Sequence, residues 1–162
     1  MDRNNFIFKD QNPSARHIAV GCIAIYSSIP EPIREVNPRP VREEQRREGT
    51  PWTYFDEASD QNNKCGAGLM IHLNIHRSLK ASVGLGNGTN NYAKLLALKL
   101  LLCWLTHLGI HSVQIFEDSM NIIKWFNGVS RCQNYILSPL LEAKYLKSFF
   151  NDFSLSYIQV TQ

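Results

Sequence analysis

A leucine-rich stretch at residues 95–108 constrains the fold more than any other part of the chain. Its sequence, LLALKLLLCWLTHL, places apolar side chains around nearly the whole circumference of a helix. Such a helix is stable only when other elements cover it from several sides, so it is expected to be central. Thr89 and Asn90 are residue types favoured at a helix N-cap, and Gly109 is typical of the position after a helix. We therefore expect a buried helix over residues 90–108.

Three segments that favour β-strands precede this helix. They are residues 52–58 (WTYFDEA), 65–74 (CGAGLMIHLN) and 77–85 (RSLKASVGL). Because only short polar loops join them, the pattern predicts an antiparallel meander.

The chain after the helix alternates between short strands and helices. The pattern predicts a buried strand at 112–116, a helix at 120–126, a helix at 140–150 with Pro139 at its first position, and a strand at 155–160. The resulting order, βββαβααβ, predicts an α/β fold in which helices pack on the faces of a mixed sheet.

The first 50 residues have a different composition. Residues 30–51 read PEPIREVNPRPVREEQRREGTP, with closely spaced prolines and charges that nearly cancel. This predicts a solvated linker with a short frayed helix at 41–47, whereas residues 16–28 are compatible with either a strand or a helix. We expect a polar, proline-rich tail and linker at 1–50 and a folded domain at 51–162.

Composition narrows the function classes. The net charge of +3 is too small for nucleic-acid binding through bulk charge, so any such binding depends on local placement. The four cysteines lack metal-ligand spacing, which predicts reduced thiols in an intracellular protein. No signal peptide is recognisable. The two longest apolar runs, residues 18–29 and 95–108, do not approach the roughly 20 apolar residues of a membrane span. We expect a soluble protein of the cytoplasm or nucleus, without membrane association.

Two aspartates close predicted strands. Asp56 ends the run YFD and Asp118 ends IFED. A carboxylate at the end of a buried strand is costly unless something stabilises it, so a metal or polar site is one hypothesis. Capping of the following loops is the other interpretation, and the residues alone leave both open.

Longer strings around these aspartates resemble a known family. They are WTYFDEAS at 52–59, CGAGLMI at 65–71, LGNGTNNYAKLLALKLLL at 85–102 and IFEDSMNIIKWFNG at 115–128. Together they resemble the RNase H type 1 family, and closely the reverse-transcriptase-like RNase H domain of plant retroelement polyproteins. The resemblance spans roughly residues 51 to 162.

The resemblance implies a fold and an activity. The fold is a five-stranded mixed sheet of order 3-2-1-4-5, with the first three strands antiparallel and helices on both faces. The activity is metal-dependent cleavage of the RNA strand of an RNA–DNA hybrid, with two Mg²⁺ ions held by four carboxylates.

This chain departs from the family at the metal ligands. Asp56 and Asp118 match the first and third acids and are the candidate catalytic and metal-binding residues. Lys94 stands where the family has glutamate, and the chain ends in YIQVTQ, before the position of the last aspartate. We therefore expect a domain truncated after the fifth strand, catalytically impaired and with Mg²⁺ binding lost. Lys94 is expected to act as an internal counter-ion to Asp56 and Asp118.

Two further acids adjoin the candidate ligands. Glu57 and Glu117 occupy positions where the family prefers glycine. Successive side chains of an extended segment point to opposite faces, so neither glutamate is expected to reach the site from the side of Asp56 and Asp118.

The candidate nucleic-acid-binding residues are better preserved. Thr89, Asn90, Asn91 and Ser119 match family positions, and the first three contact a DNA phosphate and base edges in the family. Capping of the helix is the alternative role for Thr89 or Asn90. Because Arg131 is the one basic residue in the segment 127–138, we expect weak binding of an RNA–DNA hybrid or other nucleic acid, by a monomer.

The sequence is compatible with three functions. The first is a hybrid ribonuclease, as the family implies. The second is a non-catalytic, nucleic-acid-binding remnant of a retroelement, which Lys94 and the missing last acid favour. The third is a protein-interaction module that uses the polar tail.

Overall fold

The computed structural model describes residues 45–159 of the chain. The predicted order of strands and helices is confirmed. The elements are β1 (Trp52–Ser59), β2 (Lys64–Asn74), β3 (Arg77–Asn87), α3 (Asn90–His107), β4 (Ser112–Glu117), α4 (Met120–Phe126), the 3₁₀ turn η2 (Asn134–Ile136), α5 (Leu137–Lys147) and β5 (Asp152–Tyr157).

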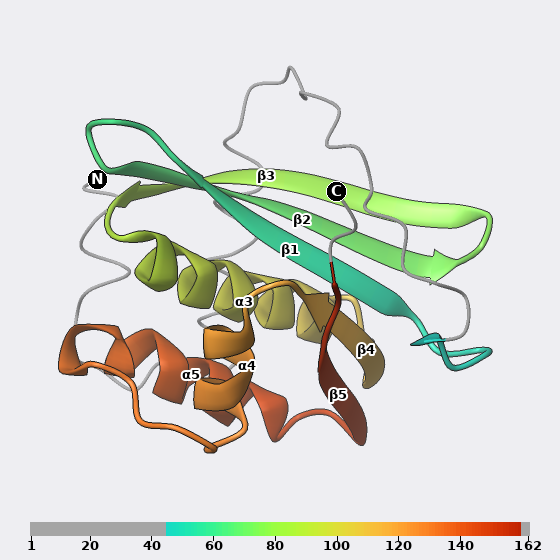
Figure 1. Ribbon diagram of the computed structural model, residues 1–162. Helices are drawn as coiled ribbons and strands as arrows, with labels where there is room; N and C mark the ends of the chain where they lie inside the picture. The colour runs from blue at the N-terminus through green and yellow to red at the C-terminus, as the bar shows by residue number, and fades with distance from the viewer. Residues whose placement is uncertain (1–44, 160–162) are drawn as a thin grey trace.

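The five strands form one mixed sheet of order β3-β2-β1-β4-β5, as the resemblance implied (Figure 1). β1, β2 and β3 are antiparallel neighbours, whereas β1 pairs with β4, and β4 with β5, in parallel. The carboxyl ends of β1 and β4 therefore meet at the same edge of the sheet, which is where α/β sheets place their binding sites.

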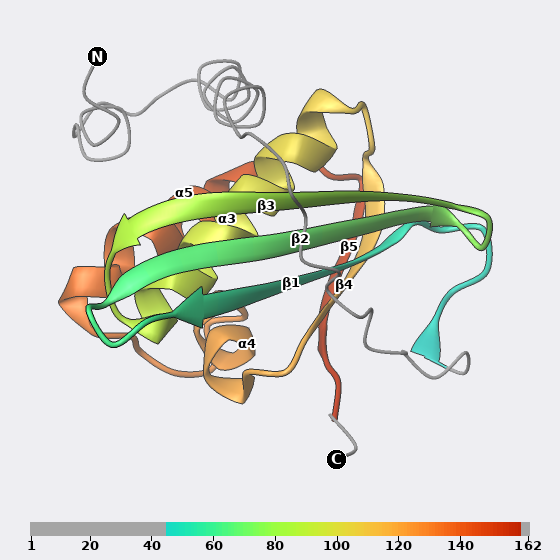
Figure 2. The same cartoon turned by 90° about the horizontal axis from the view of Figure 1, so that it is seen from above.

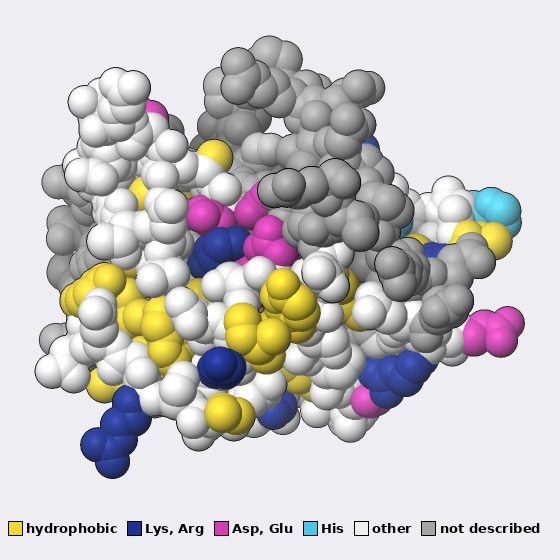
Figure 3. Space-filling model, viewed as in Figure 1, with side chains coloured by type: hydrophobic (Ala, Val, Ile, Leu, Met, Phe, Trp, Pro, Cys, Tyr) yellow, Lys and Arg dark blue, Asp and Glu magenta, His cyan; other side chains and the backbone are white. Residues whose placement is uncertain are grey.

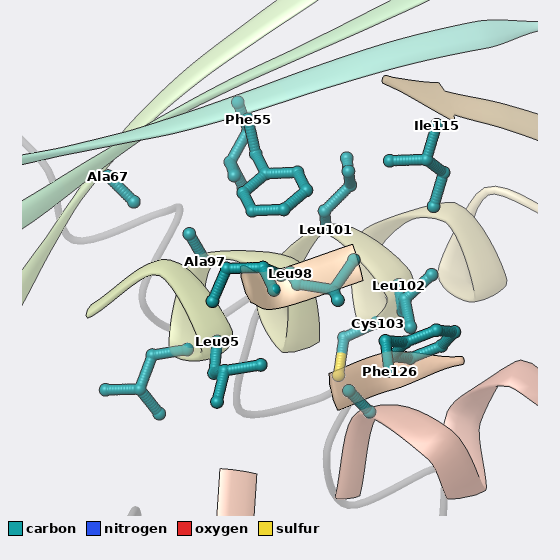
Figure 4. Packing of buried hydrophobic residues seen from close by; sticks show 14 of the residues in the cluster. Phe55, Ala67, Leu95, Ala97, Leu98, Leu101, Leu102, Cys103, Ile115 and Phe126 are labelled. Carbon is teal, nitrogen blue, oxygen red and sulfur yellow. The ribbon is translucent and has the colours of Figure 1, made fainter. Parts of the chain in front are cut away.

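α3 is the centre of the main hydrophobic core. It lies between the sheet on one side and α4 and α5 on the other (Figures 1 and 2). Figure 4 shows Phe55 and Ile115 reaching α3 from the sheet, and Phe126 of α4 approaching it from the opposite side. This arrangement explains why α3 is apolar around its circumference, because both of its sides are buried.

Within the described residues, the helices contribute to the core on one face of the sheet. Ile122 and Phe126 of α4, together with Leu140 and Leu146 of α5, belong to the same cluster as α3. A helix on the opposite face, which was expected, is not among the elements between residues 45 and 159.

The two ends of α3 follow the predicted capping pattern. Thr89 is the N-cap, and its Oγ1 accepts a hydrogen bond from the backbone N–H of Tyr92 at 3.3 Å. The C-cap is Leu108, so the helix is one residue shorter than predicted. Gly109 follows with φ +71°, in the left-handed region where glycine carries no penalty.

The C-terminal elements begin earlier than the sequence pattern predicted. α5 starts at Leu137, so Pro139 is its third residue and not its first. Proline is tolerated there because the first N–H groups of a helix have no partner within it. β5 starts at Asp152, three residues before the prediction, because its pairing with β4 already begins at Asp152 opposite Ser112.

The segment before β1 is attached to the sheet. Gln114 of β4 accepts a hydrogen bond from the backbone N–H of Arg47 at 2.6 Å, and Arg47 forms an ion pair with Asp152 at 2.7 Å. The helix predicted at 41–47 falls largely outside the described residues, and residues 16–28 fall wholly outside them.

The remaining expectations concern the cysteines and membranes. Cys65 and Cys103 are buried and Cys132 is partly exposed, whereas Cys22 lies outside the described residues. In the part of the chain that the structure describes, no helix combines the length and the apolar character that crossing a bilayer requires.

Candidate functional site

Acidic side chains gather where β1 and β4 end, against the first turns of α3. β1 contributes Asp56 and Glu57, and Glu117 is the last residue of β4, followed by Asp118. Lys94, in the second turn of α3, extends towards this edge of the sheet. Three elements that are distant in the sequence thus build one polar cluster.

The amino group of Lys94 lies at the centre of the cluster. Its Nζ is 2.8 Å from Glu117 Oε1 and 3.1 Å from Asp118 Oδ1, and it donates a hydrogen bond to each. It also forms ion pairs with Glu57 Oε2 at 2.9 Å and with Asp56 Oδ1 at 3.5 Å. Figure 3 shows a basic side chain among acidic ones near the middle of this face of the molecule.

Glu57 and Glu117 reach the site, although strand alternation sets them on the other side from Asp56 and Asp118, as expected. Both glutamates contact Lys94, and more closely than Asp56 does. Strand alternation holds, since Glu57 shares the helix-facing side with Phe55. That side is where Lys94 lies, so the glutamates approach the amino group from within the core. The aspartates reach it from the outer edge of the same cluster.

Burial divides the four carboxylates into two pairs. The side chain of Glu117 has no exposed surface and that of Glu57 is 11% exposed, whereas the Asp56 side chain is 39% exposed. Burial raises the pKa of Glu117 to about 7, although Lys94 acts in the opposite direction. Burial likewise raises the pKa of Glu57 against the influence of Lys94. Burial therefore makes both glutamates hold a proton more tightly than an exposed glutamate does.

Lys94 remains charged in this environment. Burial alone would lower its pKa, but the charges and hydrogen bonds of Glu117 and Glu57 outweigh burial and raise the pKa above its ordinary value. A charged ammonium beside partly exposed aspartates is a stable counter-ion and a poor nucleophile.

The donor set does not fit a magnesium ion. Carboxylate oxygens are the ligands Mg²⁺ prefers, but here each of the four carboxylates has the Lys94 ammonium within 3.5 Å. A divalent cation placed among them would meet that positive charge at contact distance. Between residues 45 and 159, no grouping of three or more His, Cys, Asp or Glu side chains is arranged to hold a metal.

The predicted nucleic-acid-binding residues lie beside this cluster. Thr89 and Asn90 are exposed at the start of α3, and Asn91 is partly exposed. Asn90 Oδ1 accepts a hydrogen bond of 2.6 Å from Ser59 Oγ, which ties the helix start to the end of β1. Ser119 is the N-cap residue of α4, and its backbone N–H donates to Glu117 Oε1 at 2.9 Å.

The sequence pattern did not reveal that both glutamates take part in the cluster, although a signal was present. Glu57 and Glu117 each adjoin a strand-end aspartate, and one lysine interrupts the apolar start of α3. A buried lysine needs opposite charge nearby. With two acidic pairs at the edge that faces this helix, four carboxylates were available to supply that charge.

Several solved structures with a similar fold are RNase H domains. An RNase H1 from the halophilic archaeon Halobacterium salinarum matches with a TM-score of 0.63 and 23% identity, over 68% of this chain and 86% of that one. The N-terminal RNase H domain of a Mycobacterium tuberculosis protein matches with a TM-score of 0.62 and 20% identity, over 67% and 81%.

A third match is a complex. LC11-RNase H1, solved with an RNA/DNA hybrid, matches with a TM-score of 0.61 and 21% identity, over 67% of this chain and 85% of that one. No protein-family profile matches the sequence, and no curated protein matches it either. At this identity the likeness establishes the fold: the chain has an RNase H-like fold, with the sheet order and the helix packing described above.

Proposed function

We propose that this chain is a nucleic-acid-binding domain of the RNase H type 1 family, of plant retroelement origin, in which a lysine replaces the metal centre. The observation that carries the proposal is the position of the Lys94 amino group, within 3.5 Å of four carboxylates. The ammonium neutralises the charge that metal ions neutralise in a two-metal nuclease. The proposed domain binds its ligand but cleaves it at no more than a trace rate.

Nucleic-acid binding is supported by the fold and by the polar residues at the start of α3. One structural neighbour was solved with an RNA/DNA hybrid. In this chain Thr89 and Asn90 are exposed next to the N-terminal amides of an 18-residue helix, a place suited to a backbone phosphate. We propose that these two residues, with Asn91 and Ser119, contact the hybrid.

Loss of cleavage follows from charge. Two-metal hydrolysis needs one cation to activate water and another to stabilise the leaving oxygen. An ammonium on a side chain enclosed by four carboxylates does neither, because its hydrogen bonds are already directed at Glu117 and Asp118. Asp56 and Asp118 are thus proposed to be former metal ligands that now form ion pairs with Lys94.

Binding and cleavage are separable in one experiment. The full chain is titrated into a fluorescein-labelled RNA–DNA hybrid, and binding is read from fluorescence anisotropy in EDTA and in 5 mM MgCl₂. We expect weak binding that does not depend on metal and that weakens as salt rises. A double-stranded DNA of the same length is the comparison ligand, and it should bind more weakly than the hybrid.

The same samples are then resolved on denaturing gels in Mg²⁺ and in Mn²⁺. We expect no metal-dependent cleavage of the RNA strand. Robust cutting that disappears in Asp56→Asn would show that the chain is a hybrid ribonuclease, and the proposal would be wrong. Absence of hybrid binding in every buffer would overturn the nucleic-acid-binding part and favour a protein-interaction module.

A further inference from the structure

The sheet has a second apolar surface, on the face opposite α3. It consists of Trp52 and Tyr54 of β1, His72 of β2, Phe116 of β4 and Ile158, and we call it the second-face cluster. The rings of Trp52 and His72 are stacked, with centroids 4.8 Å apart, and those of Tyr54 and Phe116 lie 6.0 Å apart. The cluster thus bridges three adjacent strands.

Strand alternation places this cluster away from the described helices. Phe55 and Ile115 point into the main core, so their neighbours Tyr54 and Phe116 point to the other face. Figures 1 and 2 show α3 and α5 on a single side of the strands β1, β2 and β3.

Met70 of β2 shows that this face is not an ordinary solvated surface. Met70 pairs in register with Tyr54, on the opposite face to Leu69 and Ile71 of the main core. It is nevertheless only 6% exposed. An apolar side chain with that burial and no described helix above it indicates that this face is covered.

The segment that leads into β1 runs over this same face. The guanidinium of Arg46 stacks on the Trp52 ring at 4.5 Å from its centroid. One residue further, Arg47 hydrogen-bonds to Gln114, which lies on the same side of β4 as Phe116. The chain therefore enters the described fold directly above the second-face cluster.

The sequence upstream of the described residues contains an apolar run. Residues 18–29 read IAVGCIAIYSSI, one of the two longest apolar runs in the chain. Between this run and Gln45 lie residues 30–44, and 15 residues can span up to about 50 Å when extended. The run can therefore reach any part of the second face.

We propose that residues 18–29 pack on the second-face cluster of the sheet and form the layer that covers it. The occupant is a segment of the same chain, attached where Arg46 stacks on Trp52, and the contact is apolar on both sides. The domain then includes part of its N-terminal tail, with α3 on one face of the sheet and residues 18–29 on the other. This assignment is independent of nucleic-acid binding.

The competing surface is a stripe on α5. Leu137, Leu141 and Tyr145 are exposed and recur every four residues, so they form one apolar line along the helix, and the exposed Phe149 follows just beyond its end. This stripe belongs to the helix layer, whereas Arg46 and Trp52 lie on the other face of the sheet. Attachment of the tail at Trp52 therefore favours the second-face cluster over α5.

Photo-crosslinking in the full chain tests the assignment. The photoreactive residue p-benzoylphenylalanine replaces Ser78, which is exposed on β3 and pairs in register with His72. In a matched sample it replaces Tyr145 on α5. After irradiation, the adducts are mapped by peptide mass spectrometry in a mixture of isotopically light and heavy chains, which separates intramolecular from intermolecular products.

The expected result is an intramolecular adduct between position 78 and residues 18–29, with no such adduct from position 145. An adduct from position 145 alone would place the segment on α5. Intermolecular adducts would show that a second copy of the chain occupies the face. The absence of any adduct from position 78 would show that residues 18–29 do not pack there. Each of these three results overturns the proposal.

A pair of double variants provides a second measurement. Ile23→Asp with Ile25→Asp puts two charges into the apolar run, whereas Ser27→Asp with Ser28→Asp adds the same charge at its polar positions. The isoleucine variant should lose at least nine-tenths of the cross-link and melt at a lower temperature, and the serine variant should change neither. Equal yields and equal melting temperatures in the two variants would contradict the proposal.

Discussion

The Nζ atom of Lys94 lies 2.8 Å from Oε1 of Glu117, a residue whose side chain has no exposed surface. A buried carboxylate without a counter-charge is strongly destabilising, and so is a buried ammonium. Each group is therefore tolerated in the core because of the other. The second strand-end glutamate, Glu57, joins the same pair from β1 at 2.9 Å.

Removing the lysine should destabilise the domain strongly. Lys94→Met keeps the length and apolar stem of the side chain but leaves Glu117 and Glu57 buried without a cation. Breaking one side of a buried ion pair costs about 3–5 kcal/mol. We expect a loss of this size in the free energy of unfolding, measured by urea denaturation of the full chain at neutral pH.

Lys99 provides the matched control for that variant. It lies on the same helix and is 9% exposed, as Lys94 is, but the acidic partner described for it is Glu142 alone. Lys99→Met should cost about 1 kcal/mol or less, because Glu142 is partly exposed and water can solvate it. Equal losses in the two variants would show that the four-carboxylate environment adds nothing.

The response to magnesium should appear only when the charge at position 94 is reversed. The melting temperature of the wild type should not change in 10 mM MgCl₂, because a ligand stabilises only a state that it binds. Lys94→Glu should melt at a lower temperature without metal. If its Kd for Mg²⁺ is about 1 mM, 10 mM metal adds about 1.4 kcal/mol, or roughly 5 °C for a domain of this size.

Lys99→Glu, with NaCl at matched ionic strength, controls for charge reversal on α3. It should show no shift with Mg²⁺, because Asp56, Glu57, Glu117 and Asp118 surround position 94 and not position 99. An upward shift of the wild type in MgCl₂ would mean that Lys94 does not exclude the ion.

Stability should fall as pH rises towards neutrality. The pKa of Glu117 is about 7 in the folded protein against an ordinary value of 4.5, so between these pH values the folded state binds more protons than the unfolded state. The stabilisation from that bound proton is complete below about pH 4.5 and is lost as pH passes 7. Glu117→Gln cannot bind the proton, so its stability relative to the wild type should improve by up to a few kcal/mol from pH 5 to 8. Urea midpoints at four pH values measure this, and parallel profiles of the two proteins would contradict it.

Hybrid binding should depend on Asn91, at the start of α3, without a matching effect on stability. Asn91→Ala should weaken binding to the RNA–DNA hybrid about fivefold, the effect of one lost hydrogen bond, and leave the melting temperature unchanged. Thr89→Ala removes the N-cap and should lower the free energy of unfolding by about 1 kcal/mol as well. Thr89→Ser keeps the capping oxygen and is the control. An Asn91→Ala protein that binds as the wild type does would exclude Asn91 from the interface.

Elements defined by local patterns could be predicted from the sequence. The apolar circumference of residues 95–108 predicted a central helix, and the capping residue Thr89 and Gly109 marked its ends. Alternation and short loops predicted the three antiparallel strands. The sheet order came from the resemblance to a family and not from the pattern itself. α5 and β5 were misplaced by three residues because their start is determined by tertiary packing and by pairing with β4.

The composition of the candidate site could be predicted only in part. Asp56, Asp118 and Lys94 were expected to meet, and they do. Glu57 and Glu117 belong to the site because the Lys94 side chain extends from α3 towards the sheet. No local sequence pattern specifies how deeply that side chain is buried. Alternation along the strands places the glutamates and the aspartates on different sides of the sheet. The lysine side chain is long enough to contact the carboxylates on both sides.

The place of Lys94 on α3 also has a consequence for how the domain assembles. In a metal centre the neutralising charge arrives from solution, and its supply depends on the concentration of free ions. Here the charge is covalently attached to a helix, so its effective concentration at the carboxylates is set by chain geometry alone. Before α3 docks, the acidic ends of β1 and β4 repel each other. Docking of the helix and alignment of the two parallel strands therefore reinforce one another, and the ion pairs join them in a single cooperative folding step.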